Sequence, residues 1–361
     1  MKIGVLTFHH ASNYGAVLQT YATCSILRRM GHQPFVLDYR PEGLYEHYFK
    51  MSWKRCGLLG QNFVNLRLNP KFRHFRERWL PVSSQCCRSH LELLKQVEEL
   101  DAVFYGSDQI WNPKLFGGHL DPAFWASGID SKICKVSISA SFGGTDGLAD
   151  SYGEQIAQLI QNFDVVSVRE QHAADLIQQV SGLRATVLLD PVFSLESWEE
   201  VLEPMPGYEG CVFQFVLQQN QGVYDASRML ADRLDARIVS GNSGFKKRGS
   251  AVIPVTPSVG QWLWLIKHAS HVVTNSFHAT AFSTIFGKPF TVVELEGNMR
   301  PRNQRISNLL EWGGLRERMV PCLKDSDLND QRLSAPDYSK FVCELNQGKA
   351  RFHSFIENSL Q

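Results

Sequence analysis

Short apolar runs alternate with longer amphipathic stretches along most of the chain. The first run, residues 2–8, predicts a buried strand, and a polar loop follows it over residues 9–14. Residues 16–30 then carry apolar side chains at helical spacing, with Gly31 as a stop signal, and residues 33–39 predict a second strand. A strand, a helix and a second strand in this order are typical of a parallel α/β sheet.

The same alternation continues toward the C-terminus. It predicts strands at 101–105, 133–140, 164–168, 186–189, 211–217, 237–240, 271–274 and 289–295, and helices at 153–162, 224–234, 259–267, 278–286 and 338–359. Two prolines and two glycines in residues 195–210 indicate a connection between domains. We therefore expect an α/β protein with two Rossmann-like domains facing a cleft, at residues 1–197 and 205–335, and a C-terminal helix at 336–361.

Composition and charge exclude several classes of protein. The 361 residues are 43% hydrophobic, so the chain can bury a core, and the net charge of +1 argues against a nucleic-acid partner. No apolar run reaches the ~20 residues that a membrane-spanning helix needs. The eight cysteines lack C-x-x-C and metal-finger spacing, so we expect a reduced, cytoplasmic protein.

A basic stretch at residues 71–79 has aromatic side chains at 72, 75 and 79. It could form a nucleic-acid patch, but a solvated helix above packed aromatic rings fits a neutral chain better. The chain contains no G-x-G-x-x-G after the first strand, no P-loop, no H-E-x-x-H and no G-x-S-x-G. Neither a tightly held dinucleotide nor any other cofactor is expected.

The loop after the first strand is the first candidate site. Asn13, Tyr14 and Gly15 lie where a helix begins, and the N-terminus of a helix favours a phosphate or carboxylate. The alternative is that Asn13 only caps the helix and Gly15 relieves a turn. His9 and His10 suggest a metal, but no further ligands follow at a useful spacing, so no metal site is expected.

Two further polar loops follow predicted strands. Ser107, Asp108 and Gln109 come after the strand at 101–105, and Ser141 comes after the strand at 133–140. Ligands collect at the carboxyl ends of strands in open α/β sheets, so these residues are candidate binding residues. The alternative for Asp108 is that it caps a short helix.

The strongest candidate site is the junction of the strand at 271–274 with the next helix, where Ser276 and Phe277 precede His278. A histidine there can donate to a phosphate or transfer a proton. Arg169, after another strand, can pair with a carboxylate or phosphate, or only with Glu170 or Asp175. Lys288 and Arg305 add positive charge downstream.

Several of these segments occur together in a recognisable order: 6–9, 13–19, 106–112, 167–170, 190–192, 276–280 and 287–289. In this order and spacing the chain resembles the polysaccharide pyruvyl transferase family, from near the N-terminus to about residue 315. The resemblance implies a glycosyltransferase-B-like pair of Rossmann-like domains. The first would hold the acceptor and part of the donor site, and the second the donor.

The implied reaction moves the enolpyruvyl group of phosphoenolpyruvate onto a sugar and forms a pyruvate ketal in surface polysaccharide biosynthesis. By position, Arg169 and His278 would bind or act on the donor, phosphoenolpyruvate. The sugar acceptor would be lipid-linked, nucleotide-linked or polymeric, and a lipid-linked acceptor implies peripheral contact with a membrane.

One residue departs from the family pattern. Many members carry Arg-Leu-His where this chain has Ser276-Phe277-His278, so Lys288, Arg302 or Arg305 would replace the missing guanidinium. Two other functions stay open. One is a nucleotide-sugar glycosyltransferase, with Glu294 or Glu296 binding a ribose. The other is a carbohydrate-binding protein without activity.

Overall fold

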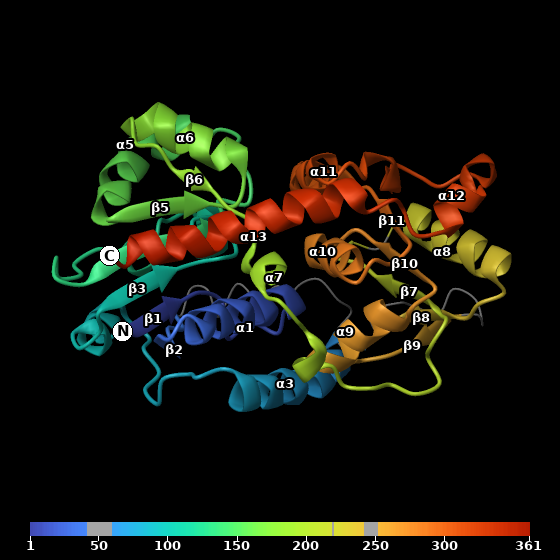
Figure 1. Ribbon diagram of the computed structural model, residues 1–361, viewed down its shortest axis with the longest axis horizontal. Helices are drawn as coiled ribbons and strands as arrows, with labels where there is room; N and C mark the ends of the chain where they lie inside the picture. Colours follow the sequence, from blue (N-terminus) through green and yellow to red (C-terminus); the bar gives the residue numbers. More distant parts are fainter. Residues whose placement is uncertain (42–59, 219, 242–251) are drawn as a thin grey trace. The chain divides into compact units, whose positions relative to one another are not determined.

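The computed structural model describes residues 1–41, 60–218, 220–241 and 252–361, and within them the chain forms two compact units. Unit 1 contains the described residues 1–41 together with Arg73–Glu196 and Gln347–Gln361. Unit 2 contains Ser197–Asn346 and the first part of helix α3, up to Phe72. Each unit has a parallel six-stranded sheet with helices on its faces (Figure 1).

The sheet of unit 1 has the strand order β2-β1-β3-β4-β5-β6. Its strands are β1 (Lys2–Leu6), β2 (Gln33–Val36), β3 (Ala102–Tyr105), β4 (Cys134–Ala140), β5 (Val165–Val168) and β6 (Thr186–Val187). Its helices are α1 (Tyr14–Arg29), α3 (Gly60–Trp79, shared with unit 2), α4 (His90–Val97), α5 (Leu148–Leu159), α6 (Gln171–Ser181) and α7 (Pro191–Ser194). The order reverses between β1 and β3, so right-handed crossovers place α1 on one face and α5 and α6 on the other, as Figure 1 shows.

The sheet of unit 2 has the strand order β12-β11-β10-β7-β8-β9. Its strands are β7 (Val212–Phe215), β8 (Ile238–Ser240), β9 (Val252–Pro254), β10 (His271–Thr274), β11 (Phe290–Val293) and β12 (Met319–Val320). Its helices are α8 (Gln221–Leu234), α9 (Val259–His268), α10 (Phe277–Ile285), α11 (Asn303–Trp312), α12 (Asp330–Leu333) and α13 (Ser339–Ser359), the last of which continues into unit 1. The order reverses between β7 and β10.

The cores lie on both faces of these sheets. Every residue of β3, β7, β10 and β11 is buried, which is typical of parallel strands covered by helices on both sides. In unit 1, Trp111 and Trp125 stack with ring centroids 4.7 Å apart and anchor an aromatic cluster over the sheet.

The expected class, an α/β fold with two Rossmann-like halves, is confirmed. The units divide between Glu196 and Ser197, beside the expected boundary. Two segments differ from the expected ranges: α3 begins in unit 2, and the end of α13 belongs to unit 1 rather than forming a separate C-terminal piece. Within the described ranges no helix is both long and apolar enough to cross a membrane.

Candidate active site

Each sheet reverses its strand order at one point, and ligands of open α/β sheets bind beside the carboxyl ends of the strands there. In unit 1 that point lies between β1 and β3, which run into Thr7–His10 and Ser107–Gln109. In unit 2 it lies between β7 and β10, and β10 runs directly into Ser276, Phe277 and His278. The candidate residues of the two units are described separately.

Arg169 of unit 1 is buried between two carboxylates. Its Nε donates to Oε1 of Glu170 at 2.8 Å, and its Nη1 donates to Oδ2 of Asp190 at 2.8 Å. All three side chains are at most 5% exposed. Burial alone would lower the pKa of Arg169, but the two carboxylates outweigh it and raise the pKa above its usual value. The predicted pair with Glu170 is therefore present, though buried, whereas Asp175 contacts Gln171 instead.

Ser107 connects this ion pair to the neighbouring strands. Its hydroxyl donates to Asp190 Oδ2 at 3.2 Å and its backbone N–H to Gln19 Oε1 at 3.1 Å. Gln19 in turn donates to Thr7 Oγ1 at 2.8 Å. The ends of β1 and β3 and the start of α7 thus share one buried hydrogen-bond network.

Ser141 extends the same network toward Glu170. Its hydroxyl donates to Glu170 Oε1 at 3.1 Å, on the atom that also accepts from Arg169. The other carboxylate oxygen, Oε2, is buried and has no hydrogen-bond partner in the part of the chain that the structure describes. That oxygen can accept one more hydrogen bond, for instance from a hydroxyl group.

Gly106 allows the chain to turn sharply from β3 into this network. Its φ is +117°, and a Cβ at this position would approach the carbonyl oxygen of Ile138 to 2.5 Å. A side chain would therefore be strained here, and it would collide with the backbone of β4 at Ile138.

The remaining candidates of unit 1 have structural partners. Asn13 caps α1, because its side chain accepts from the N–H groups of Gly15 and Ala16. Tyr14 is buried, and burial raises its pKa. Asp108 has a φ of 65° and accepts from its neighbour Gln109 rather than capping a helix, and Gln109 accepts from Asn112 at 2.9 Å. Asn13 therefore caps the helix as the alternative expected, and whether it also binds a ligand stays a prediction; Gly15 lies inside the first helical turn.

Asn275 joins the two loops at the reversal point of unit 2. Its Oδ1 accepts from the N–H of Leu217 at 2.7 Å, and its Nδ2 donates to the carbonyl of Gln218 at 2.8 Å. Thr274 adds a bond from its hydroxyl to the carbonyl of Phe215 at 2.6 Å. These contacts fix the loop after β7 against the start of α10.

Ser276, Phe277, His278 and Arg305 come together at the N-terminus of α10. Ser276 is the buried N-cap residue, and its side chain does not cap the helix. The Phe277 ring lies 5.2 Å from the His278 ring, and the Arg305 guanidinium lies 5.9 Å from the Phe277 centroid. An imidazole, a guanidinium and a helix N-terminus thus meet in one place, and each of these groups can attract an anion.

Lys288 is not part of this group. It follows the C-terminus of α10, whereas His278 is in the first turn of that helix, and it lies beside the amino end of β11, at the opposite edge of the sheet. Its backbone accepts from the Tyr338 hydroxyl at 2.7 Å, and burial lowers its pKa. Of the suggested replacements for the missing guanidinium, Arg305 is the one that lies beside Phe277.

The glutamates considered for a ribose have other neighbours. Oε1 of Glu294 lies 3.8 Å from Nη2 of Arg316, and exposed Glu296 binds Gln218 through its backbone. Among the described residues no group of three or more His, Cys, Asp or Glu side chains could hold a metal ion. His9 binds Asp38 rather than forming such a group with His10.

Comparison with known families decides the assignment. Residues 13–296 match the family model of polysaccharide pyruvyl transferases. The chain belongs to this family. As a member it is a transferase of polysaccharide biosynthesis.

Solved structures with similar folds include UDP-N-acetylglucosamine 2-epimerases. The putative enzyme from Listeria monocytogenes is 11% identical with a TM-score of 0.56, covering 99% of this chain and 97% of its own. The Methanocaldococcus jannaschii enzyme, solved with UDP-GlcNAc and UDP, is 12% identical with a TM-score of 0.52 and covers 99% of both chains. The S. aureus MnaA–UDP structure is 12% identical with a TM-score of 0.51, covering 99% of this chain and 91% of its own.

At these identities the similarity concerns the fold, and it agrees with a GT-B-like architecture for this pyruvyl transferase family member. No curated protein matches the chain.

The sequence motifs include Asp190 and Gln19 without a role, and Glu170 only as a possible partner of Arg169, yet all three build the network of unit 1. Their positions directly after strands, or one helical turn into α1, were the available signal. Asn275, which directly follows the predicted strand at 271–274, is not among the predicted site residues. An amide or carboxylate side chain that follows a strand thus indicates a hydrogen bond to the loop after a neighbouring strand.

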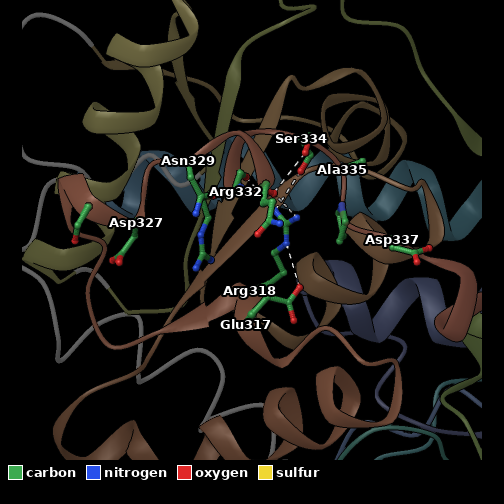
Figure 2. Close-up of a pocket in the computed structure, with 11 residues that line it drawn as sticks. Glu317, Arg318, Asp327, Asn329, Arg332, Ser334, Ala335 and Asp337 are labelled. Carbon is green, nitrogen blue, oxygen red and sulfur yellow. Dashed lines mark hydrogen bonds and ion pairs between the residues drawn. The ribbon is translucent and has the colours of Figure 1, made fainter.

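A pocket of about 540 Å³ lies elsewhere in unit 2 (Figure 2). Arg318, Arg332 and Glu317 line it, with Arg318 and Glu317 forming an ion pair at 3.5 Å. Glu317 and Arg318 precede β12, so the pocket lies at the amino edge of the sheet, away from His278. The carboxylates of Glu317, Asp327 and Asp337 line it as well.

Proposed function

We propose that the protein transfers the enolpyruvyl group of phosphoenolpyruvate to a sugar, forms a cyclic pyruvate ketal and releases phosphate, in the assembly of a surface polysaccharide or glycan. The observation that supports this most is the position of His278 in a member of this family. It lies in the first turn of α10 at the reversal point of the unit 2 sheet, next to Phe277, whose ring Arg305 contacts.

The chemistry requires one proton donor and one anion-binding group. A first sugar hydroxyl adds to the substituted carbon of the alkene, and the methylene carbon gains a proton to become a methyl group. A second hydroxyl then bonds to the same carbon as the carbon–oxygen bond to phosphate breaks, and the proton of that hydroxyl passes to the departing phosphate or to a base. We assign to His278 the proton transfer or a hydrogen bond to the departing phosphate.

We assign the negative charges of the donor mainly to the group around His278. Arg305 and the N-terminus of α10 supply positive potential there. Arg169 remains a further candidate for the donor carboxylate or phosphate. Because Glu170 and Asp190 already bind its guanidinium, an incoming anion must compete with both.

The loops of unit 1 are the proposed acceptor side. Asn13–Gly15, Ser107–Gln109 and Ser141 supply backbone and hydroxyl groups suited to a sugar, and Glu170 Oε2 can accept from a sugar hydroxyl. The acceptor would be carried on a lipid, a nucleotide or a polymer. A cytoplasmic location with peripheral membrane contact would follow from a lipid-linked acceptor.

The direct test is to incubate the purified protein with phosphoenolpyruvate and candidate saccharides and to measure released phosphate and acid-labile ketal. A thermal-shift screen adds a second readout, since a ligand that binds only the folded state raises the melting temperature. We expect stabilisation by phosphoenolpyruvate. Stabilisation by UDP-sugars alone would favour a glycosyltransferase, and saccharide binding without use of phosphoenolpyruvate would favour an inactive binding protein.

A further inference from the structure

Three amide side chains link the loops at the carboxyl edge of the unit 2 sheet. The first, Asn275, accepts from the N–H of Leu217 at 2.7 Å and donates to the carbonyl of Gln218 at 2.8 Å. Gln218 repeats this pattern toward the next loop: its Oε1 accepts from the N–H of Glu296 at 2.8 Å, and its Nε2 donates to the carbonyl of Glu296 at 3.2 Å. Paired hydrogen bonds therefore join the loops after β7, β10 and β11.

Asn303 is the third amide, and it lies at the start of α11. Its Oδ1 accepts from the N–H of Leu295 at 2.8 Å, and its Nδ2 donates to the carbonyl of Leu295 at 3.0 Å. Between these two residues the chain passes through Glu296 and a largely exposed 3-10 helix, Gly297–Arg302. The amide ties both ends of this exposed segment together, so the start of α11 is fixed against the loop after β11.

Each of the three amides faces one N–H and one carbonyl of the backbone. An amide side chain has an acceptor oxygen and donor hydrogens, so it can bind both groups at once. A carboxylate of the same size has no donor and would face a carbonyl oxygen. Amides also carry no charge, so these bridges place no negative group beside the proposed donor site, unlike the carboxylates that bind Arg169 in unit 1.

The bridges connect the beginnings of two helices that contribute to that site. Arg305 is buried and follows Asn303 by two residues in α11. Its guanidinium lies 5.9 Å from the centroid of Phe277, which follows Asn275 by two residues. Helices α10 and α11 pack against each other (Figure 1). The contacts of the three amides thus run from the helix that carries His278 to the helix that carries Arg305.

We propose that Gln218 and Asn303 are positioning residues that hold Arg305 in the geometry that binds the anionic donor. This inference rests on the proposed function, in which phosphoenolpyruvate binds around His278. A guanidinium binds a carboxylate or phosphate through hydrogen bonds whose strength depends on direction, so a small shift of α11 weakens the binding. In this scheme neither amide contacts the donor, and both act through Arg305.

The first test is calorimetric titration of the full-length protein with phosphoenolpyruvate, which needs no acceptor. We expect Asn303→Ala to raise the Kd about fivefold to tenfold, since two hydrogen bonds beside Arg305 are lost. Gln218→Ala should raise the Kd less, by about two- to fivefold, because this amide lies one bridge further from Arg305. A wild-type Kd in both variants would overturn the proposal.

Two amides of the same unit serve as matched controls. Asn329→Ala removes an amide that caps α12 beside the pocket of Figure 2, at the amino edge of the sheet. Gln221→Ala removes an exposed amide of α8 that binds Asp225 at 2.8 Å. Both variants should keep the wild-type Kd for phosphoenolpyruvate. A rise equal to that of the bridging variants would show that the effect is not specific to the bridges, and would also overturn the proposal.

A double-mutant cycle separates positioning from a general structural role. If Asn303 acts through Arg305, its replacement has no further effect once Arg305 is absent. The double variant Asn303→Ala/Arg305→Ala should therefore bind phosphoenolpyruvate as Arg305→Ala alone does. If the two effects multiply instead, Asn303 does not act through Arg305 and the proposal is wrong.

A resonance of Arg305 tests the inference without any ligand. The ring current of Phe277 shifts the Nε–H signal of Arg305, which is assigned by its absence in Arg305→Ala. Asn303→Ala and Gln218→Ala should move this signal toward that of an exposed arginine, and Asn329→Ala should leave it in place. Since Gln218 is a half-buried loop residue, its variant keeps the test available if Asn303→Ala folds poorly.

The two readouts distinguish the possible failures. A signal that stays in place in both bridging variants would overturn the inference, whatever the protein does with phosphoenolpyruvate. If the signal moves but the wild type neither binds phosphoenolpyruvate nor releases phosphate from it, the proposed function is wrong and the positioning of Arg305 by the two amides stands.

Discussion

The carboxyl edges of the two sheets have the same topology and different chemistry. In unit 1 the side chains at the reversal point bind one another: Arg169 contacts Glu170 and Asp190, and Ser107 joins them. In unit 2 the amide of Asn275 holds the backbone in place, and the rings of Phe277 and His278 lie at the start of α10.

The difference suggests a division of roles. A guanidinium held by two buried carboxylates is a poor receptor for a further anion, but it fixes three strand ends in one arrangement. An imidazole at a helix N-terminus, near an arginine that contacts an aromatic ring, has the character of an anion and proton site. The unit 1 edge should therefore matter first for stability, and the unit 2 edge for turnover.

The largest expected effect is on catalysis in unit 2. Replacing His278 by alanine should lower turnover of phosphoenolpyruvate by about 100- to 10,000-fold, the usual contribution of a positioned acid or base. The melting temperature should change little, because the imidazole is only half-buried. His268→Ala, a half-buried histidine of the same unit stacked on Trp264, is the control and should keep full turnover. Undiminished activity in His278→Ala would remove it from the mechanism.

The next effect concerns the stability of unit 1. Asp190→Ala removes one of the two carboxylates that bind the buried Arg169, and we expect the free energy of unfolding to fall by about 3–5 kcal/mol. Urea denaturation followed by circular dichroism measures it. Asp175→Ala, an exposed carboxylate on α6, should cost less than about 0.5 kcal/mol. A similar cost for both would mean that the buried network does not hold the strand ends.

A third prediction uses acid to compare the two units. Burial lowers the pKa of His10 in unit 1 and of His271 in unit 2 to about 3, with Arg318 and Arg332 contributing at His271. Below the ordinary histidine pKa the unfolded chain binds protons that the folded chain does not. Stability should therefore fall as the pH drops from about 6.5 toward 4, by at most about 1.4 kcal/mol per pH unit for each histidine.

Substitutions assign this slope to its sources. His271→Gln should remove the contribution of unit 2 to the pH dependence of stability, and His10→Gln should remove the contribution of unit 1. Both are measured as the pH dependence of the free energy of unfolding. If either variant keeps the full wild-type slope, that histidine is not buried in its neutral form.

The smallest effect concerns how Arg305 is positioned. Phe277→Leu removes the ring beneath the guanidinium, a contact whose typical value is about 0.5–2 kcal/mol. We expect a several-fold rise in the KM for phosphoenolpyruvate with nearly unchanged kcat, while Phe277→Tyr keeps the ring and the wild-type KM. A fall in kcat alone would show that Phe277 acts through His278 instead.

Much of the fold could be predicted from hydrophobic spacing. The strands at β1, β3, β4, β5 and β10 and the helices α1, α8, α9 and α13 begin and end close to the predicted residues. The short strands β9 and β12 were not predicted, because two or three residues are too few to show a period. Helix α11 was missed as well, and it contributes Arg305 to the site.

The sequence by itself determined the alternation of strands and helices, the family motifs and the residues that follow each strand, because these depend on local spacing. Only the tertiary structure decided which of those residues meet. His278 lies in the first turn of α10 and Lys288 follows the last turn, so the helix places them at opposite edges of the sheet. Arg169 reaches Asp190, twenty-one residues away, because β5 and β6 are neighbours. Whether a charge is compensated depends on such distant pairs, and local spacing contains no information about them.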